Sequence, residues 1–269
     1  FPSLAAARSV AAAALAGDGT AEGVLASPKE KVLAATRLGV DGRLGYPQPL
    51  PSEGKPLAVA ASDLNADGKI DLAYLFEEGG KRSLGLLFQE GEGTWKAKTQ
   101  ELLGLKTDPR GLKVLDANQD GRPDLAVFVL QEPLRLLLQD AQGEFREATG
   151  FRKGLVDNLD PAALGTADLT GDGKPEMLVA STGFARALRM GEGGVLEVLD
   201  QFNARESDTE IALALSADLD GDGAPEILLA PRKSEELQLL RKDAQGVFRF
   251  SKSLSLGRLE LVGAELGVI

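Results

Sequence analysis

The chain has 269 residues and is acidic, with 41 Asp and Glu against 30 Lys and Arg, a net charge of -11 and a sequence pI near 4.7. This balance argues against a nucleic-acid-binding protein, which would carry basic patches. Cysteine and histidine are both absent, so disulfides and thiol chemistry are excluded, and the usual zinc ligands and the commonest general base are missing. No run reaches about 18 apolar residues, so we expect no membrane insertion.

The N-terminal stretch carries a degenerate copy of a motif that recurs along the chain. The Ala-rich residues 4–15 align with apolar strands found later, so we predict a strand there rather than a helix. The nine residues Ala14–Glu22 then resemble an acidic loop, but Ala14 and Ala16 occupy its first and third positions. We expect this loop to fold like the complete copies and to bind metal poorly or not at all.

Four complete copies of the acidic loop follow at near-constant spacing, beginning at residues 63, 116, 168 and 218. Their sequences are DLNADGKID, DANQDGRPD, DLTGDGKPE and DLDGDGAPE. A period of about fifty residues marks one structural unit that is repeated along the chain.

Each complete loop places oxygen-bearing side chains at alternating positions, as a site for a hard cation requires. Calcium takes about six to eight oxygen ligands, and side chains at loop positions 1, 3 and 5 can converge on one centre. Position 6 is always glycine, where we expect a turn with positive φ. Position 7 offers a backbone carbonyl, and position 9 closes the cage. The predicted ligand residues are Asp63, Asn65, Asp67, Lys69 and Asp71; Asp116, Asn118, Asp120, Arg122 and Asp124; Asp168, Thr170, Asp172, Lys174 and Glu176; and Asp218, Asp220, Asp222, Ala224 and Glu226.

The loops have two alternative interpretations, metal-free turns and EF-hands. Asp, Asn and Gly favour Asx turns without any metal, although four copies in phase favour calcium. An EF-hand is excluded because its loop needs a Glu at position 12 and flanking helices. Here each loop is followed by a short apolar run that is typical of a buried strand, at residues 72–76, 125–130, 177–180 and 227–230. Thr170 makes its loop the weakest, and the loop at 218–226 is the most acidic.

A second marker, glycine followed two residues later by a large apolar side chain, keeps the same period. It occurs at Gly42–Leu44, Gly93–Trp95, Gly143–Phe145, Gly193–Val195 and Gly246–Phe248. Each unit then contains an apolar first strand, the acidic loop, a second and a third strand, and a fourth strand opened by the marker. Four strands in about fifty residues predict one blade of a β-propeller. We expect the proline-containing stretches 47–51 and 158–161 to connect blades.

The loops and the Gly-x-aromatic marker resemble the FG-GAP or VCBS repeats of the integrin-α N-terminal propeller and of many bacterial surface proteins. The similarity extends over nearly the whole chain. It implies calcium held on the loop between the first two strands of a blade, and a propeller that serves as a binding platform. Calcium binding is not carried over to residues 14–22, where the ligand positions depart from the family pattern.

We therefore expect an all-β chain that forms a single β-propeller domain over residues 1–269, with five four-stranded blades. The repeat units are expected at about 1–50, 51–104, 105–156, 157–206 and 207–257, with a partial strand at 258–269. That partial strand closes a five-bladed ring, or the chain is part of a larger propeller, for example a seven-bladed one. The start at Phe1 and the end inside a unit favour a processed or partial chain.

The acidity of the chain is largely explained by the loops. They hold thirteen acidic ligand residues, and about four structural calcium ions would reduce the net charge from -11 to about -3. Loops of this kind bind calcium at about 10⁻⁴–10⁻³ M, as extracellular modules do, and cytosolic calcium is too scarce to fill them. We expect an exported protein that is extracellular, on the cell surface or periplasmic.

The function expected from these features is a calcium-stabilised binding or scaffolding module, because loops at the ends of a propeller are free to vary. Its partner is expected to be a protein or a surface glycan, within a larger surface assembly. The alternative is a carbohydrate-active enzyme such as a polysaccharide lyase, which Tyr46, Tyr74, Arg135 or Arg186 could serve. No catalytic residue is assigned. A calcium sensor is disfavoured because sensors open pairs of helices.

Overall fold

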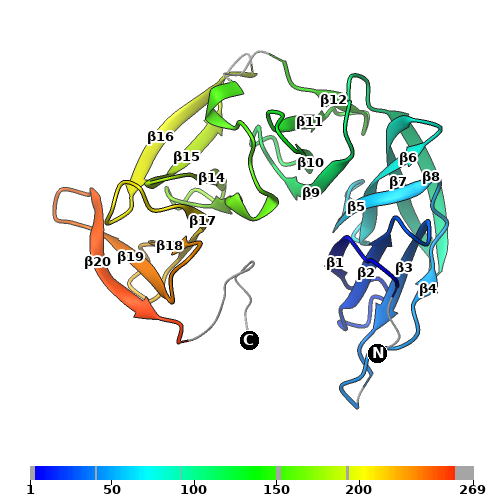
Figure 1. Ribbon diagram of the computed structural model, residues 1–269, viewed down its shortest axis with the longest axis horizontal. Coiled ribbons are helices and arrows are strands. Elements are labelled where there is room, and N and C mark those ends of the chain that lie inside the picture. The colour runs from blue at the N-terminus through cyan, green and yellow to red at the C-terminus, as the bar shows by residue number, and fades with distance from the viewer. Residues whose placement is uncertain (1–3, 40, 92, 150–152, 192–193, 258–269) are drawn as a thin grey trace. The chain divides into compact units, whose positions relative to one another are not determined.

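The computed structural model describes residues 4–39, 41–91, 93–149, 153–191 and 194–257, and within these ranges every regular element longer than three residues is a β-strand. The strands form five four-stranded antiparallel sheets, and in each sheet the strands are neighbours in chain order (Figure 1). The predicted all-β fold of five four-stranded propeller blades is confirmed. Over the same ranges, none of the helices has the length and apolar character that crossing a membrane requires.

The chain divides into two compact units. The first comprises residues 1–115 and 122–147, and the second comprises residues 116–121 and 148–269. The single domain over residues 1–269 stays a prediction. The partial strand expected at 258–269 lies outside the described residues.

The first unit contains three blades. Blade 1 consists of β1 (Ser9–Ala13), β2 (Glu22–Ser27), β3 (Val32–Arg37) and β4 (Gln48–Pro49). Blade 2 consists of β5 (Lys55–Ser62), β6 (Asp71–Glu78), β7 (Lys81–Gly91) and β8 (Thr94–Glu101). Blade 3 consists of β9 (Pro109–Leu115), β10 (Asp124–Val129), β11 (Arg135–Gln139) and β12 (Phe145–Glu147). The Ala-rich opening is therefore a strand over β1, as the alignment of the repeats predicts.

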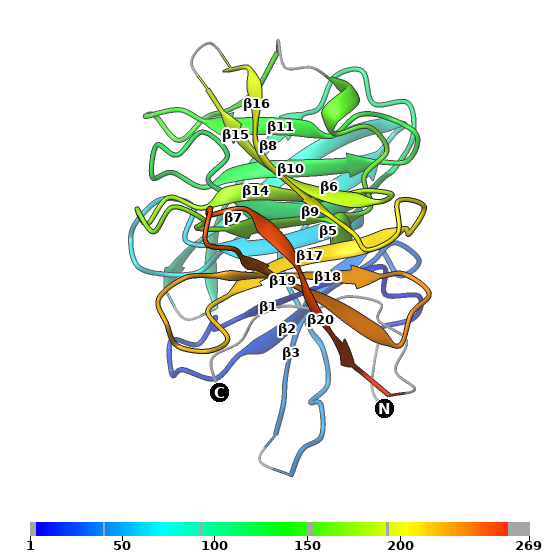
Figure 2. The same cartoon turned by 90° about the vertical axis from the view of Figure 1, so that its left-hand side faces the viewer.

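The second unit contains the remaining two blades. Blade 4 consists of β13 (Leu164–Ala167), β14 (Glu176–Ala180), β15 (Phe184–Met190) and β16 (Leu196–Asn203). Blade 5 consists of β17 (Ile211–Ala217), β18 (Glu226–Pro231), β19 (Glu236–Lys242) and β20 (Phe248–Ser255) (Figure 2). Two short 3₁₀ turns, η1 (Lys153–Leu155) and η2 (Pro161–Ala163), precede blade 4, so residues 158–161 connect blades as expected.

Burial falls from the second strand of a blade to the fourth. In β10, β14 and β18 every residue is buried, whereas β16 and β20 are mostly exposed. The second strands therefore read in the sequence as continuous apolar runs, because both of their faces are covered. The fourth strands pair on one side only and carry polar residues, which suits an edge that faces solvent.

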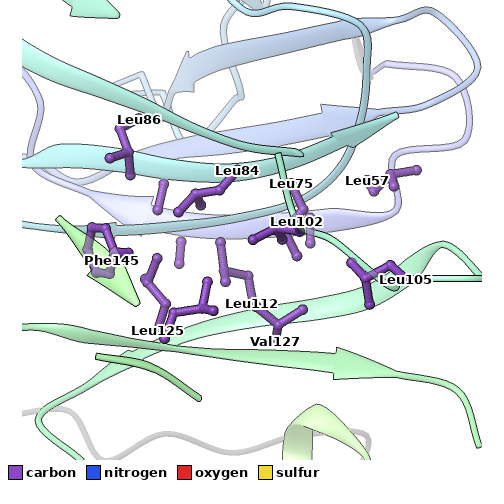
Figure 3. Packing of buried hydrophobic residues seen from close by; sticks show 14 of the residues in the cluster. Leu57, Leu75, Leu84, Leu86, Leu102, Leu105, Leu112, Leu125, Val127 and Phe145 are labelled. Carbon is purple, nitrogen blue, oxygen red and sulfur yellow. The ribbon is translucent and has the colours of Figure 1, made fainter. Parts of the chain in front are cut away.

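Apolar side chains fill the space between neighbouring blades of the first unit. Leu57, Leu75 and Leu84 of blade 2 and Leu112, Leu125 and Val127 of blade 3 belong to one buried cluster (Figure 3). Phe145, the aromatic residue of the marker in blade 3, lies in the same cluster. A second cluster joins blades 1 and 2, and Trp95 packs against it. The marker residues thus serve packing between blades.

The second unit has a similar core between blades 4 and 5. The rings of Phe202 and Phe248 meet edge to face with their centroids 5.0 Å apart. The first strands of the two blades approach closely. A Cβ at Gly165 of β13 would lie only 3.0 Å from the backbone oxygen of Ala214 of β17. A side chain at Gly165 would therefore press on the backbone of the neighbouring strand.

Blade 1 differs from the sequence prediction at its outer edge. The marker at Gly42–Leu44 was expected to open the fourth strand, but Leu44 only forms an isolated bridge with Leu38. The fourth strand is β4, which pairs with β3 and lies inside the proline-rich stretch that was expected to be a connection. An edge position tolerates Pro49 because one side of an edge strand needs no backbone donor.

The marker of blade 4 is displaced by one residue from its predicted place. Gly191 donates its N–H to the oxygen of Val195, and Gly194 donates to the oxygen of Gly191, with φ of 75° at Gly194. The turn glycine is thus Gly194, and the buried apolar residue that follows is Leu196 rather than the exposed Val195. Gly193 itself lies outside the described residues. Adjacent glycines made the register ambiguous in the sequence.

Gly85 of β7 is the position where blade 2 is most sensitive to added volume. It pairs with Tyr74 of β6, and a Cβ at Gly85 would lie 2.2 Å from Cζ of that ring, which is itself buried. We predict that Gly85→Ala lowers the free energy of unfolding by about 1–3 kcal/mol, as overpacking does. Urea denaturation measures this change.

Gly91→Ala is the matched control, because Gly91 lies in the same strand and a Cβ there would meet nothing within 4 Å. Its effect should stay within about 0.5 kcal/mol. Equal losses for the two variants would contradict the packing of Tyr74 over Gly85.

Candidate metal centres

The acidic loops occupy one equivalent place in every blade, between the first strand and the second. Residues 63–71 lead from β5 into β6, and residues 218–226 lead from β17 into β18. The last residue of each loop is the first residue of the second strand. The ninth position is therefore held by the sheet, whereas positions 1 to 8 form the turn.

The carboxylate at position 1 of each complete loop accepts hydrogen bonds from the backbone of the turn. Its Oδ2 accepts the backbone N–H of the glycine at position 6, at donor–acceptor distances of 2.8, 2.8, 2.8 and 2.9 Å from Asp63, Asp116, Asp168 and Asp218 respectively. Its Oδ1 accepts the N–H of position 4 or 5 in each of these loops, as from Gly171 to Asp168 at 2.7 Å. These hydrogen bonds hold the pKa of the Asp168 carboxyl below its usual range, the bond from Gly173 having the largest effect.

Two positions in each turn have a left-handed backbone. The glycine at position 6 has φ between 78° and 86° in all five loops, which confirms the expected turn. Position 4 is also left-handed, with φ of 60° at Ala66 and 58° at Gln119, where glycine is absent. The sequence analysis did not identify this second position. Its signal was the glycine that stands at position 4 in the other three loops, Gly17, Gly171 and Gly221.

The loop at 218–226 brings three carboxylates together. One oxygen each from Asp218, Asp220 and Asp222 lies within 4.8 Å of the others, and all three residues are exposed. Two ligands bound to one ion at 2.3–2.6 Å can be at most about 5 Å apart, so these oxygens fit a single calcium-sized cation. Among the described residues this is the one group of three such side chains at that spacing.

The third and fifth positions also meet in the loops of blades 2 and 3. Nδ2 of Asn65 lies 3.3 Å from Oδ2 of Asp67, and Nδ2 of Asn118 lies 2.8 Å from Oδ2 of Asp120. The side chains of these two positions are therefore adjacent, and all four are exposed except Asn118, which is half-buried. In blade 4, Thr170 and Asp172 are exposed as well.

The long side chains at position 7 reach the third strand, and Nζ of Lys69 also lies 3.7 Å from Oδ2 of Asp67 within the turn. The Nζ of Lys69 donates to the backbone oxygens of Gln89 and Glu90 at 3.3 and 3.1 Å, and Nε of Arg122 donates to the backbone oxygen of Gln139 at 3.0 Å. The residue type can vary here because only its backbone carbonyl is expected to face the cation. Lys174 and Ala224 are exposed and half-buried, respectively.

The ninth carboxylates are buried and brace the loop. Oδ2 of Asp71 accepts the N–H of Leu64 at 3.0 Å, and Oδ1 accepts the N–H of Gln89 at 2.8 Å. Glu22, Glu176 and Glu226 accept the N–H of the second loop residue in the same way. Burial raises the pKa of the Asp71 carboxyl, although these amides oppose the shift. Ninth-position residues thus have a structural role beside the ligand role predicted for them.

Two glutamines that the sequence analysis missed connect the ninth-position carboxylates to the neighbouring blade by hydrogen bonds. Nε2 of Gln89 donates to the backbone oxygen of Leu15 at 2.6 Å, and Nε2 of Gln139 donates to that of Leu64 at 2.8 Å. Leu15 and Leu64 each hold position 2 of the loop one blade earlier. The loop of one blade is thereby fixed to the third strand of the next within the first unit.

The residues considered for lyase chemistry are engaged in ordinary contacts. Tyr74 is buried, and its hydroxyl accepts the N–H of Glu53 at 3.0 Å. Arg135 pairs with Glu147, and Arg186 lies over the Phe184 ring with 4.3 Å from Cζ to the centroid. Tyr46 is 79% exposed on the connection that precedes β4. No acid–base pair is formed by these four residues.

Comparison with known proteins identifies the repeat. The FG-GAP-like repeat family matches residues 63–127 and 118–179, which include three of the four complete loops. No curated protein matches the chain.

Three solved structures share the fold. A protein from Lactobacillus plantarum has a TM-score of 0.56 at 15% identity, over 86% of this chain and 65% of its own. The rhamnogalacturonan lyase YesW has a TM-score of 0.52 at 16% identity, over 90% of this chain and 50% of its own. A functionally unknown protein from Desulfotomaculum acetoxidans has a TM-score of 0.54 at 12% identity, over 91% and 70%. The chain spans less than two thirds of the first two proteins, and the likeness is one of fold alone.

The two roles of the carboxylates can be separated by substitution. Asp71→Ala leaves the buried N–H groups of Leu64 and Gln89 without their acceptor, so we predict a loss of about 2 kcal/mol of unfolding free energy even in EDTA. Asp67→Ala removes an exposed fifth-position side chain and should cost less than about 0.5 kcal/mol in EDTA. Urea denaturation in EDTA makes the comparison. A larger loss for Asp67→Ala than for Asp71→Ala would contradict the assigned braces.

Proposed function

We propose that this chain, which carries FG-GAP repeats, is a calcium-stabilised binding or scaffolding module of an exported protein. The observation that carries the calcium assignment is the set of oxygens from Asp218, Asp220 and Asp222 within 4.8 Å of one another. Hard oxygen donors at this spacing, without histidine or cysteine, suit calcium better than zinc or copper. The proposed sites are the four complete loops.

Preorganisation of the loops supports this assignment. The first carboxylate is already held by backbone amides, and the turn has its left-handed residues in place. A cation that binds there would relieve repulsion between carboxylates rather than order a flexible segment. Its binding energy therefore adds directly to the stability of the folded state.

We propose export because the expected stabilisation by calcium is large and requires a calcium concentration found outside the cytosol. At a calcium concentration ten times the dissociation constant, each filled site adds about 1.4 kcal/mol. Four sites would add about 6 kcal/mol, which is comparable with the net stability of a typical domain. Sites that bind at about 10⁻⁴–10⁻³ M are filled outside the cytosol and not within it.

The connection between β3 and β4 supports a partner-binding role. It exposes Leu38, Leu44 and Tyr46, the last by 79%. Exposed loops on a rigid sheet scaffold are the usual place for recognition, and an exposed tyrosine offers both apolar area and a hydrogen-bonding hydroxyl. The proposed partner is a protein or a surface glycan, and both can use these two features.

Calcium dependence is tested by thermal melting. We predict that EDTA lowers the melting temperature by about 10 °C or more, because 1 kcal/mol shifts a chain of this size by about 2–4 °C. Readdition of calcium should restore the transition, whereas equal magnesium should not, since magnesium demands octahedral geometry at about 2.0–2.1 Å. An unchanged midpoint in EDTA would retire the calcium proposal.

Partner class and lyase activity are separated by one panel of acidic polysaccharides. We predict that incubation with the protein in calcium releases no unsaturated sugar ends, measured by ultraviolet absorbance, because Tyr74 and Arg135 are occupied structurally. Binding to a glycan of the panel without cleavage supports the glycan form of the proposal. Release of unsaturated ends would replace the binding module with an enzyme.

A further inference from the structure

The degenerate loop of blade 1 contains a cation of its own. The guanidinium of Arg37 forms an ion pair with Asp18, which holds the fifth loop position. Arg37 is also the cross-strand partner of Glu22, the ninth position. The Arg37 side chain, through its hydrogen bond, holds the pKa of the Asp18 carboxyl below its usual range. The two acidic residues that this loop retains therefore both face one arginine.

An arginine occupies the equivalent position in blade 5. Arg241 follows Leu240, which pairs with Ile227, so it lies beside Glu226. Its Nη2 is 2.8 Å from Oδ2 of Asp220, and its Nε is 3.4 Å from Oε1 of Glu226. That Nε is fully buried and makes no hydrogen bond. The guanidinium thus reaches into the acidic loop and touches its third and ninth positions.

The equivalent residue is apolar in blades 2 and 3. Phe88 follows Leu87, which pairs with Leu72, and Leu138 follows Leu137, which pairs with Leu125. These are the two blades whose ninth position is Asp rather than Glu. Glu at the ninth loop position is therefore accompanied by an arginine on the third strand, and Asp at the ninth position is accompanied by an apolar residue there.

We infer that the arginine on the third strand is a built-in counter-cation that sets how much calcium each loop requires. In blade 1, Arg37 replaces the metal altogether, because the first and third ligand positions are Ala14 and Ala16. In blade 5, Arg241 competes with the metal for Asp220 and Glu226. Part of the negative charge of the most acidic loop, 218–226, is then already compensated before calcium binds.

The physical reason is charge balance within one loop. Carboxylates that converge within 4.8 Å repel one another, and any cation that reaches them lowers this repulsion. A guanidinium already in contact supplies one unit of positive charge in the absence of metal. Calcium must then bind beside that charge or displace it, and either costs affinity.

Blade 4 supplies the matched control. Arg189 follows Leu188, which pairs with Met177, so it has the same place in its blade as Arg241. Arg189, however, pairs with Glu197 of β16, with 3.6 Å between Nη2 and Oε2. Arg189→Gln therefore removes the same charge from the same strand position without removing a partner of Asp168 or Glu176.

The inference builds on the proposed calcium function, and the test separates the two. In the full chain, Asp67→Ala, Asp120→Ala and Asp172→Ala together leave 218–226 as the one complete loop. Calcium binding to this background is measured by titration calorimetry, alone and with Arg241→Gln or Arg189→Gln. Thermal melting in EDTA checks that each protein is folded. We expect Arg241→Gln to tighten calcium binding about tenfold, as removal of one neighbouring unit charge predicts, and Arg189→Gln to leave it within about twofold.

Unchanged or weaker binding in Arg241→Gln would overturn the inference, and so would equal tightening by Arg189→Gln. A further outcome is that the triple variant binds no calcium, with or without Arg241→Gln, while the wild-type chain does bind it. Loop 218–226 is then not a calcium site, and the inference about Arg241 fails while the proposed calcium function stands. If the wild-type chain binds none, the proposed function fails. If Arg241→Gln then creates one calcium site in a chain that otherwise binds none, this result would still support Arg241 as a counter-cation.

Blade 1 gives an independent arm. Ala14→Asp with Ala16→Asp restores the missing ligands of residues 14–22, and the number of bound calcium ions is compared with and without Arg37→Gln. We expect calcium at this loop to bind about tenfold more tightly when Arg37 is replaced. Equal binding in the two proteins would overturn the assignment of Arg37.

Discussion

Crowding of like charges in a nine-residue turn is the constraint around which each blade is organised. Three or four carboxylates lie in each complete loop, and the sheet holds the carboxylate at position 9 in place because its oxygens accept backbone N–H groups. Asp71 cannot be released without leaving the N–H groups of Leu64 and Gln89 unpaired. The repulsion must therefore be met by positive charge. The structure shows backbone amides that serve this purpose in every loop, an arginine in blades 1 and 5, and Lys69 beside Asp67 in blade 2.

This constraint links the loops to the packing of the blades. Gln89 joins the brace at Asp71 to the backbone of Leu15, and Gln139 joins the brace at Asp124 to that of Leu64. Loop geometry in one blade thus depends on the third strand of the next blade in the first unit. Buried apolar clusters between the same blades fix their separation.

The sequence predicted the repeat well because its signals are local. The period of the acidic loops placed the second strands, and the alignment of residues 4–15 with later units correctly favoured a strand over the helix that alanine would suggest. The predictions that failed concern edges and adjacent glycines. β4 lies in a proline-rich stretch, where an edge strand can omit donors, and Gly194 rather than Gly193 makes the turn of blade 4.

The candidate site was predicted only in part, because the acidic motif is local in the sequence and the contacts that support it are not. Alternation within the loop indicated the candidate ligands, but it could not show that Asp71 and Glu226 are buried and accept backbone N–H groups. That role depends on Gln89 and Arg241, which come from a strand about 15 residues further along the chain. Contacts across strands depend on register, and the acidic motif carries no information on it. The left-handed position 4 was recoverable from three glycines, yet Ala66 and Gln119 concealed it.

The claim at the centre of this account is that equivalent turns are charge-compensated differently, by metal in some blades and by arginine in blade 1. Anomalous diffraction from crystals grown in calcium tests it most directly. The account predicts density for an ion inside the turns at 63–71 and 116–124, and none inside the turn at 14–22. An ion beside Asp18 with Arg37 turned away, or ion-free density in the turns of blades 2 and 3, would contradict it.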